Sequence, residues 1–327
     1  MNADTSEATV LLDVGHGNCA VIRSGGMVAI VDSGSSNALE QHLLNEEISF
    51  VDFFFLSHAD QDHIQGAMGV MASDRFSVGA VYVNADAGKT SQLWDDLLWE
   101  LDNAATEDRT NVHIGLTPAD GPFSVGNVKL RVLGPGPYLC GHGVGGRYLG
   151  GKRISSNSIS AVIAVEHDNA CRVLLTGDVD KIGIDDLQRR AEPLTTDVLV
   201  FPHHGGQAKG ASPRLFASTL SELTQAGTTV FSTGRAATWA NPDPEIVRGV
   251  LDILGTQRIL CTQLSRHCSK SKGESSGHLL PVVSRGRERN ECCAGSIIVP
   301  HRGSVKPHRR IHKSFIRRAA ATPLCGK

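Results

Sequence analysis

The chain has 327 residues, of which 40% are hydrophobic, and its formal net charge at pH 7 is −2. A near-neutral chain of this length can bury a large core and does not need a disulfide framework. The N-terminal residues lack the apolar segment of a secretion signal, and the sequence contains no run of 18 uncharged apolar residues that could span a membrane. We therefore expect a cytoplasmic protein that does not associate with membranes.

The first part of the chain predicts a strand meander followed by alternating helices and strands. Short apolar runs separated by glycine-containing turns are typical of strands, whereas apolar residues at helical spacing indicate amphipathic helices. On these patterns we expect strands at 8–14, 19–24, 27–33, 49–57 and 78–84, and helices at 37–47, 62–73 and 91–104.

The second part returns to strands between 112 and 135 and then reaches the glycine-rich segment 139–153, which we expect to be a loop. A hairpin of two strands follows at 159–167 and 171–178, and further strands are expected at 196–202, 229–233, 258–263 and 296–300. Helices are expected at 184–192, 213–227 and 244–255. Two groups of strands with helices predict an α/β (α+β) fold of two facing sheets with helices outside, in one domain over residues 8–300.

Residues 301–327 differ from the rest in charge. Eight lysines and arginines lie between Arg302 and Lys327, without an acidic residue. Such a segment can attract a polyanion such as nucleic acid. It is also typical of a solvated, disordered terminus, and the two interpretations are compatible. We expect a basic, disordered C-terminal tail.

The densest chemical motif is SHADQDHIQG (57–66), which directly follows the buried run FVDFFFL. Alternate positions of an extended turn point the same way, so His58, Asp60 and Asp62 can converge, and His63 adds an imidazole where a helix begins. This mixture of imidazole and carboxylate suits Zn, Mn or Fe. An acidic loop without a cation is disfavoured because carboxylates so close together repel one another.

Two further clusters also come directly after predicted strands. Asp178 ends the run VLLTGD, and His203 and His204 follow DVLVFP. Taken alone, either histidine is as well explained as a hydrogen-bonded structural residue. Three such clusters in succession favour a site for two metal ions, in which one carboxylate, Asp178, could bridge.

These motifs resemble the metallo-β-lactamase fold, and most closely the branch represented by the nuclease domain of the competence protein ComEC. The resemblance covers about residues 8–263. It rests on LDVGHGNCAVI (12–22), VDSG (31–34), HADQDH (58–63), NSISAVIAV (157–165), TGD (176–178), PHHG (202–205) and NPDPEIVRGVLDILGTQRILCT (241–262). It implies a four-layer αββα sandwich with the metal site at one edge of the two sheets.

The resemblance also implies the ligands of two divalent ions, Zn or Mn. In chain order they would be His58, Asp60, Asp62, His63, Asp178 and His204. His58 and Asp60 would hold the first ion, and Asp62, His63 and His204 the second, with Asp178 as the bridge. Asp32 would orient ligands without binding metal.

The catalytic roles implied by the same resemblance fall to Asp62, Asp178 and His203. Asp62 or Asp178 would hold the proton of the attacking nucleophile, and His203 would assist the leaving group. The expected reaction is hydrolysis of a phosphodiester bond by a metal-activated hydroxide. We expect a nuclease, with a small-molecule phosphodiesterase, a phosphocholine-type esterase and a non-catalytic regulatory protein as the alternatives.

Two departures from the wider fold concern the first ion. Most members have histidine at the position of Asp60, and a further metal-binding histidine where this chain offers Asn157 and Ser158. The ComEC branch shares both departures. They weaken the hold on the first ion and favour harder ions such as Mn. A resting state with a single ion is therefore an alternative to a pair.

Two weaker signals leave their interpretations open. His16, in the turn GHGN, either lines the active site or is an exposed hairpin histidine. Four cysteines near His267 could bind a structural zinc ion or be buried thiols, and their irregular spacing favours thiols. These cysteines are Cys261, Cys268, Cys292 and Cys293.

Overall fold

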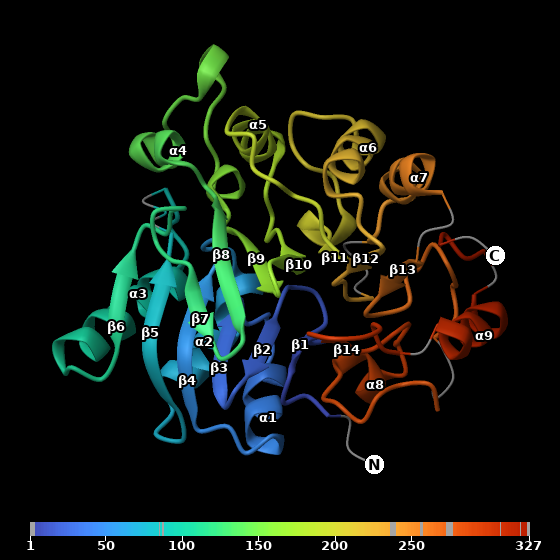
Figure 1. The fold of residues 1–327 in the computed structure, drawn as a ribbon, viewed down its shortest axis with the longest axis horizontal. Helices are drawn as coiled ribbons and strands as arrows, with labels where there is room; N and C mark the ends of the chain where they lie inside the picture. The colour runs from blue at the N-terminus through green and yellow to red at the C-terminus, as the bar shows by residue number, and fades with distance from the viewer. Residues whose placement is uncertain are drawn as a thin grey trace.

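Two seven-stranded sheets pack face to face in the computed structural model of the chain (Figure 1). The structure describes residues 4–84, 86, 88–235, 240–255, 258–272, 277–307, 309–320 and 322–325. His308 and Lys327 of the C-terminal segment lie outside the described residues. Among the described residues, no helix combines the length and the apolar character needed to cross a membrane.

The first sheet has the strand order β14-β1-β2-β3-β4-β5-β6. Its strands are β1 (Ala8–Leu11), β2 (Ala20–Ser24), β3 (Met27–Val31), β4 (Phe50–Leu56), β5 (Ser77–Val83), β6 (Asn111–Ile114) and β14 (Ile297–Pro300). The predicted meander is confirmed, because β1, β2 and β3 pair antiparallel. From β3 onward the pairing is parallel, which requires a crossover connection between successive strands.

The second sheet has the order β13-β12-β11-β10-β9-β8-β7. Its strands are β7 (Phe123–Val125), β8 (Val128–Gly134), β9 (Val162–His167), β10 (Ala170–Leu175), β11 (Val198–Val200), β12 (Thr228–Phe231) and β13 (Arg258–Cys261). The predicted hairpin is the antiparallel pair β9 and β10. Asp168 and Asn169 close it in the left-handed conformation, with φ of 52° and 61°, which suits the turn of a tight hairpin.

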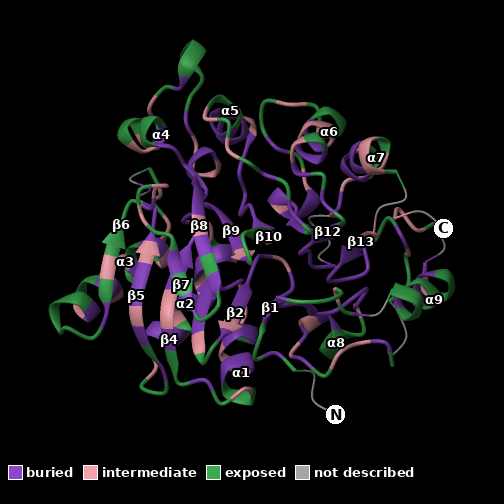
Figure 2. Cartoon of the chain, in the orientation of Figure 1, coloured by how far each residue is buried: buried purple, intermediate pink, exposed green. Residues whose placement is uncertain are grey.

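Helices cover the outer faces of both sheets, so the predicted four-layer αββα sandwich is confirmed. They are α1 (Ala38–Asn45), α2 (Gln61–Met71), α3 (Gln92–Thr106), α4 (Pro137–His142), α5 (Lys181–Arg189), α6 (Pro213–Thr224), α7 (Pro244–Leu254), α8 (Arg285–Arg289) and α9 (Arg309–Ala319). One apolar cluster fills the space between the sheets, and two more lie under the helices. Figure 2 shows the strands mostly buried, with exposed residues concentrated on the outer surfaces of helices.

Two expectations about irregular segments are wrong. The glycine-rich segment 139–153 is not wholly a loop, because α4 begins at Pro137 and buries Leu139. Proline is well tolerated in the first turn of a helix. The C-terminal tail is not disordered over 309–319, where α9 buries Phe315 and Ile316 against the second sheet's outer cluster. The burial of these apolar side chains outweighs the effect of the basic composition.

Candidate metal centre

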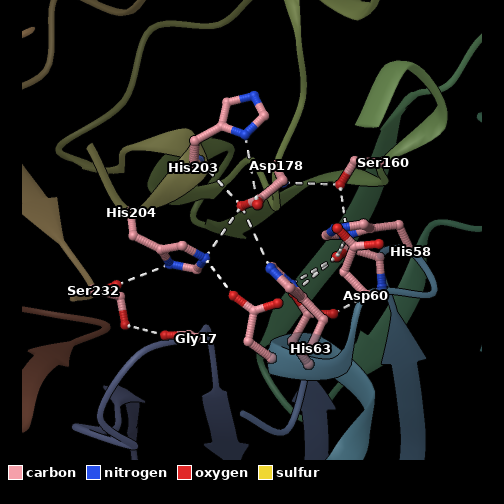
Figure 3. A network of polar contacts seen from close by, with 12 residues as sticks. Gly17, His58, Asp60, His63, Ser160, Asp178, His203, His204 and Ser232 are labelled. Carbon is pink, nitrogen blue, oxygen red and sulfur yellow. Dashed lines mark hydrogen bonds and ion pairs between the residues drawn. The ribbon is translucent and has the colours of Figure 1, made fainter. Parts of the chain in front are cut away.

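The predicted site residues gather at one edge of the sandwich, where strands of both sheets end. His58 follows β4, Asp178 follows β10, and the pair His203 and His204 follows β11. Because β3, β4, β10 and β11 are members of parallel ladders, the residues after them reach a common edge. Figure 3 shows His63, His203 and His204 turned toward the carboxylate of Asp178.

One set of potential ligands consists of His58, His63 and Asp178. Their ligand atoms lie within 4.8 Å of one another, and all three residues are buried. The rings of His58 and His63 are 4.1 Å apart, and His63 Nε2 is 3.4 Å from Asp178 Oδ1. We call this group the buried set.

A second set consists of His16, Asp62 and His204. Its ligand atoms also lie within 4.8 Å of one another. His204 Nε2 is 3.0 Å from Asp62 Oδ2, and His16 Nε2 is 3.5 Å from the same oxygen. His16 and Asp62 are partly exposed and line a cavity of about 810 Å³. We call this group the cavity set.

Asp178 lies between the two sets. Its Oδ1 is 3.4 Å from His63 Nε2 and 3.6 Å from His204 Nε2. The backbone N–H of His203 donates to this oxygen at 3.0 Å, and the backbone N–H of Asp178 donates to Ser160 Oγ at 3.0 Å. The carboxylate is thus fixed where it could bridge two ions.

Hydrogen bonds on the far side of each ring orient three histidines for metal binding. His63 Nδ1 lies 2.7 Å from Asp32 Oδ2, and His204 Nδ1 lies 2.9 Å from the Ser232 carbonyl oxygen. Because these oxygens accept, each Nδ1 carries the proton and each Nε2 presents a lone pair to the site. His58 Nδ1 contacts Ser57 Oγ at 3.0 Å in the same way.

The donor atoms fit divalent metal ions. Among the described residues, the Nε2 atoms of His58, His63 and His204 are buried without a hydrogen-bond partner. A buried imidazole nitrogen without a partner is unfavourable. Three of them aimed at carboxylates form a ligand shell rather than a packed core, so these His/Asp clusters could bind metal.

Asp60 is not in either set, contrary to the sequence prediction. Lys89 Nζ forms an ion pair with its Oδ1, and the other oxygen is 3.6 Å from His58 Nε2. The nearby His58 ring and the Lys89 ammonium keep the pKa of Asp60 below its usual range, although burial opposes this. An ammonium group thus neutralises the carboxylate that was expected to hold the first ion.

The remaining expected residues support the site from outside the ligand sets. Asp32 accepts hydrogen bonds from the backbone N–H and hydroxyl of Ser57 in addition to contacting His63, so it orients ligands as expected. His203 Nδ1 is 3.6 Å from Asp178 Oδ2. Asp32, His203 and His204 all have positive φ, of 58°, 53° and 55°. Such strained positions tend to cluster at functional sites.

Asn157 and Ser158 stand where the sequence comparison expects no metal-binding histidine, and Ser158 is engaged elsewhere. The Ser158 hydroxyl donates to Asp180 Oδ2 at 2.7 Å, and the Asn157 backbone begins a short 3₁₀ turn, Asn157–Ile159. Ser160, two residues further along, instead lies 3.4 Å from His58 Nδ1.

The electrostatics of the two central carboxylates depend on the imidazoles. Burial alone would raise the pKa of Asp62 and of Asp178. For Asp62, contacts with His204 and His63 outweigh burial, and for Asp178 the same two rings and His203 do so, which lowers both pKa values. Both groups therefore remain carboxylates that attract cations.

The imidazoles respond in the opposite sense. Burial opposes protonation of His63 and His204, but Asp32 and Asp178 raise the pKa of His63, and Asp178 is the main group that raises the pKa of His204. Burial and the neighbouring His204 instead lower the pKa of His16 to about 4. A metal ion would compete with protons for the first two rings, whereas His16 is already neutral at pH 7.

The four cysteines considered for structural zinc do not form one group. Cys261, Cys268 and Cys293 line a small cavity together with Cys325, whereas Cys292 contacts Ser284 at 3.1 Å. Within the described part of the chain, the only groups of three ligand atoms as close as 4.8 Å are the buried set and the cavity set. Burial raises the pKa of the thiols of Cys261, Cys268, Cys293 and Cys325, which keeps them protonated. This favours the interpretation as buried thiols over zinc ligands.

The sequence reasoning missed His16 as a potential ligand. A signal was present, since His16 follows β1, which runs parallel to β3 because both pair antiparallel with β2. A histidine after β1 must therefore reach the same sheet edge as His58, which follows β4.

A family model and several solved structures are similar to this chain. Residues 12–146 match the family model described as the metallo-beta-lactamase superfamily. No curated protein matches the chain. Igni18, a metallo hydrolase from Ignicoccus hospitalis, is 16% identical with a TM-score of 0.46, covering 78% of this chain and 94% of that one. The metallo-beta-lactamase fold protein YhfI from Bacillus subtilis is 13% identical with a TM-score of 0.46, covering 78% and 95%.

A third similar structure is the short form of human tRNase Z, at 16% identity and a TM-score of 0.39, covering 69% of this chain and 92% of that one. The family match covers the segment that contributes β2 to α4, including His16, Asp32 and the HADQDH motif. With the αββα sandwich and the His/Asp clusters at its edge, this match makes residues 12–146 similar to the metallo-β-lactamase superfamily.

Proposed function

We propose that this protein is a metal-dependent hydrolase of phosphodiester bonds and that its substrate is nucleic acid. The observation that carries the proposal is the position of Asp178, whose carboxylate lies between two sets of metal-ligand side chains. When bound, a pair of divalent ions lowers the pKa of water and stabilises negative charge on phosphoryl oxygens.

The protein's own residues position the reactants. The cavity presents Asp62 and Asp178 beside hydrogen-bonding side chains such as Gln207 and Asn241, which can orient a substrate. These carboxylates would repel a phosphate in the absence of cations, so substrate binding should depend on the metal. His203 lines the cavity and is held beside Asp178, where its ring can carry a proton for the leaving oxygen.

We assign the chain to the ComEC-like branch of the superfamily. Asp60 takes the place of the usual histidine, and Asn157 and Ser158 stand where the wider fold has a further ligand. Because the Ser158 hydroxyl is hydrogen-bonded to Asp180, Ser158 cannot replace the missing ligand unless its side chain moves. This assignment concerns the site alone and implies nothing about DNA uptake.

The basic C-terminal segment supports a polyanionic substrate. Arg309, Lys313, Arg317 and Arg318 are exposed on α9, while Phe315 is buried beneath them. The chain after α9 is tied to the wall of the cavity, because Thr322 Oγ1 donates to the carbonyl oxygen of His267 at 2.9 Å and His267 lines the cavity. This contact supports a nucleic acid on the exposed face of α9 that reaches toward the metal centre.

The proposal is tested by cleavage assays with Mn²⁺ or Zn²⁺ on single-stranded DNA, duplex DNA, RNA and bis-p-nitrophenyl phosphate. We expect metal-dependent cleavage of at least one nucleic acid, abolished in an Asp62→Asn variant. Asp74→Asn, which removes an exposed carboxylate outside the site, is the matched control. Cleavage of the small ester alone would favour a small-molecule phosphodiesterase. Tight metal binding without cleavage of any substrate would contradict the enzymatic role.

The role of α9 is tested separately by an Arg317→Glu/Arg318→Glu variant. If both side chains contact phosphates, nucleic-acid affinity should fall, and the slope of log affinity against log salt concentration should decrease by roughly 0.7 to 0.9 for each lost contact. Cleavage of bis-p-nitrophenyl phosphate should not change, because α9 does not contribute to the ligand sets. Unchanged nucleic-acid binding would rule out this surface as the binding face.

A further inference from the structure

We propose that His16 is a metal ligand, which completes a site with Asp62 and His204. This inference rests on the proposed metal centre, but it concerns metal binding and not turnover. It adds an imidazole from the turn after β1 to ligands that come from the HADQDH and PHHG motifs.

The first argument is the placement of the His16 ring. Its Nε2 is 3.5 Å from Asp62 Oδ2, and the ring centroid is 4.4 Å from that of His204. One ligand atom from each of the three residues lies within 4.8 Å of the others. An ion between them would receive two imidazoles and one carboxylate, which is the donor combination of many catalytic zinc sites with an open position for substrate or water.

The second argument is that the turn carrying His16 is held in place from both sheets. The Ser35 hydroxyl donates to the His16 carbonyl oxygen at 3.0 Å, and the Ser232 hydroxyl donates to the Gly17 carbonyl oxygen at 2.8 Å. Ser35 follows β3 of the first sheet, and Ser232 follows β12 of the second. An exposed hairpin histidine would not require such anchoring.

Close backbone packing fixes the same turn further. A Cβ atom on Gly17 would lie 2.3 Å from the carbonyl oxygen of Asp62, and a Cβ atom on Gly234 would lie 2.5 Å from the backbone nitrogen of His16. Glycine is therefore required at both positions. The backbone N–H of Asn18 also donates to the Asp62 carbonyl oxygen, at 3.3 Å. His16 and Asp62 are thus held by one rigid arrangement, as expected for preorganised ligands.

The third argument is the number of ligands. Asp60, which was expected to bind metal, is engaged with Lys89, and Ser158, at the position of the missing histidine, is engaged with Asp180. Counting His16, the centre still offers two imidazoles and one carboxylate to each ion. His16 thus supplies the cavity set with a third ligand, while Asp60 and Ser158 contribute none to the buried set.

The test compares metal binding by the wild-type protein, His16→Gln and His267→Gln. Each protein is stripped with a chelator, its thermal melting is recorded without metal, and Zn²⁺ and Mn²⁺ binding is measured by calorimetry and by metal analysis after dialysis. Loss of a residue that only supports a ligand costs about 10- to 100-fold in metal affinity. We therefore expect His16→Gln to weaken one of the binding steps by at least that factor and to leave the other step in place.

His267 is a matched control because its imidazole also lines the cavity but belongs to neither ligand set. We expect its replacement to leave both binding steps unchanged. His16→Ala, with a smaller side chain, provides a second variant if His16→Gln melts differently from the wild type. Wild-type affinity and stoichiometry in a normally folded His16 variant would overturn the inference, even if cleavage were lost, because His16 would then act on the substrate. If the wild-type protein bound neither metal, the proposed function would fail together with the inference.

Discussion

The buried set and the cavity set contain the same types of side chain in different surroundings. The side chains of His58, His63 and Asp178 are at most 10% exposed, whereas those of His16 and Asp62 are 23% and 24% exposed. All three residues of the cavity set line the space where a substrate would bind, whereas Asp178 is the one member of the buried set that does so. This difference in exposure indicates that the buried set holds the centre together, whereas the cavity set faces the substrate.

Supporting residues reinforce this difference. Behind the buried set, Asp32 contacts His63 and accepts two hydrogen bonds from Ser57. The buried carboxylate of Asp32 therefore depends on His63 for one of its hydrogen-bond partners. The cavity set depends on backbone groups instead, through the bond of His204 to the Ser232 carbonyl oxygen and the anchored turn at His16. Changes in the buried set should therefore affect folding as well as metal binding, and changes in the cavity set mainly metal binding.

Replacing Asp178 should have the largest effect, because this residue contacts both sets. We expect Asp178→Asn to lower kcat/KM for the cleaved substrate by about 10³-fold or more, which corresponds to roughly 4 kcal/mol of lost transition-state stabilisation. Metal analysis should also show fewer bound ions. Steady-state kinetics beside Asp74→Asn check this. Retention of both ions and of activity would show that the two sets act independently.

Replacing His63 should cost stability that replacing His16 does not. His63→Gln leaves Asp32, which is 1% exposed, without its imidazole partner. Breaking a buried pair costs about 3 kcal/mol or more, whereas His16→Gln at a partly exposed position should cost less than about 1 kcal/mol. Urea unfolding with a chelator present measures both. Equal losses would mean that the burial difference has no energetic consequence.

Removing the metal should destabilise the wild-type protein. A ligand that binds only the folded state stabilises it by about 2.7 kcal/mol at a free concentration 100 times its dissociation constant. Thermal melting with excess Mn²⁺ and with a chelator should therefore differ by several degrees. Because His16→Gln removes one ligand of the cavity set, it should show a smaller difference than the wild type. An identical melting temperature with and without metal would contradict binding at either set.

Replacing Lys89 should have the smallest effect and the opposite sign. Lys89→Met removes the ammonium paired with Asp60, which frees a carboxylate next to His58. A partly exposed ion pair is worth up to about 1 kcal/mol, so the ion nearest His58 should bind roughly fivefold more tightly. Lys152→Met, which removes a lysine paired with Asp185 away from the site, is the control. Weaker metal binding in Lys89→Met would show that the lysine supports the centre.

The amino-acid sequence determined much of this protein without the structure. Apolar runs and their periodicity predicted the two groups of strands and the αββα arrangement, because burial of one face imposes the spacing of apolar residues. The motifs at 58–63, 176–178 and 203–204 predicted a metal site because each follows a strand, and strand ends share an edge. In α9, the buried residues at 312, 315 and 316 already carried a helical spacing that the basic composition obscured.

Only the tertiary structure decided which of these groups meet. The pairing of Asp60 with Lys89 joins residues 29 positions apart, and the approach of His16 to His204 joins the turn after β1 to the end of β11. Sequence spacing predicts neither contact, because each depends on how two sheets and their loops pack together. Local patterns fix what each strand end carries, whereas long-range packing fixes which carboxylate is neutralised and which imidazole becomes available to a metal ion.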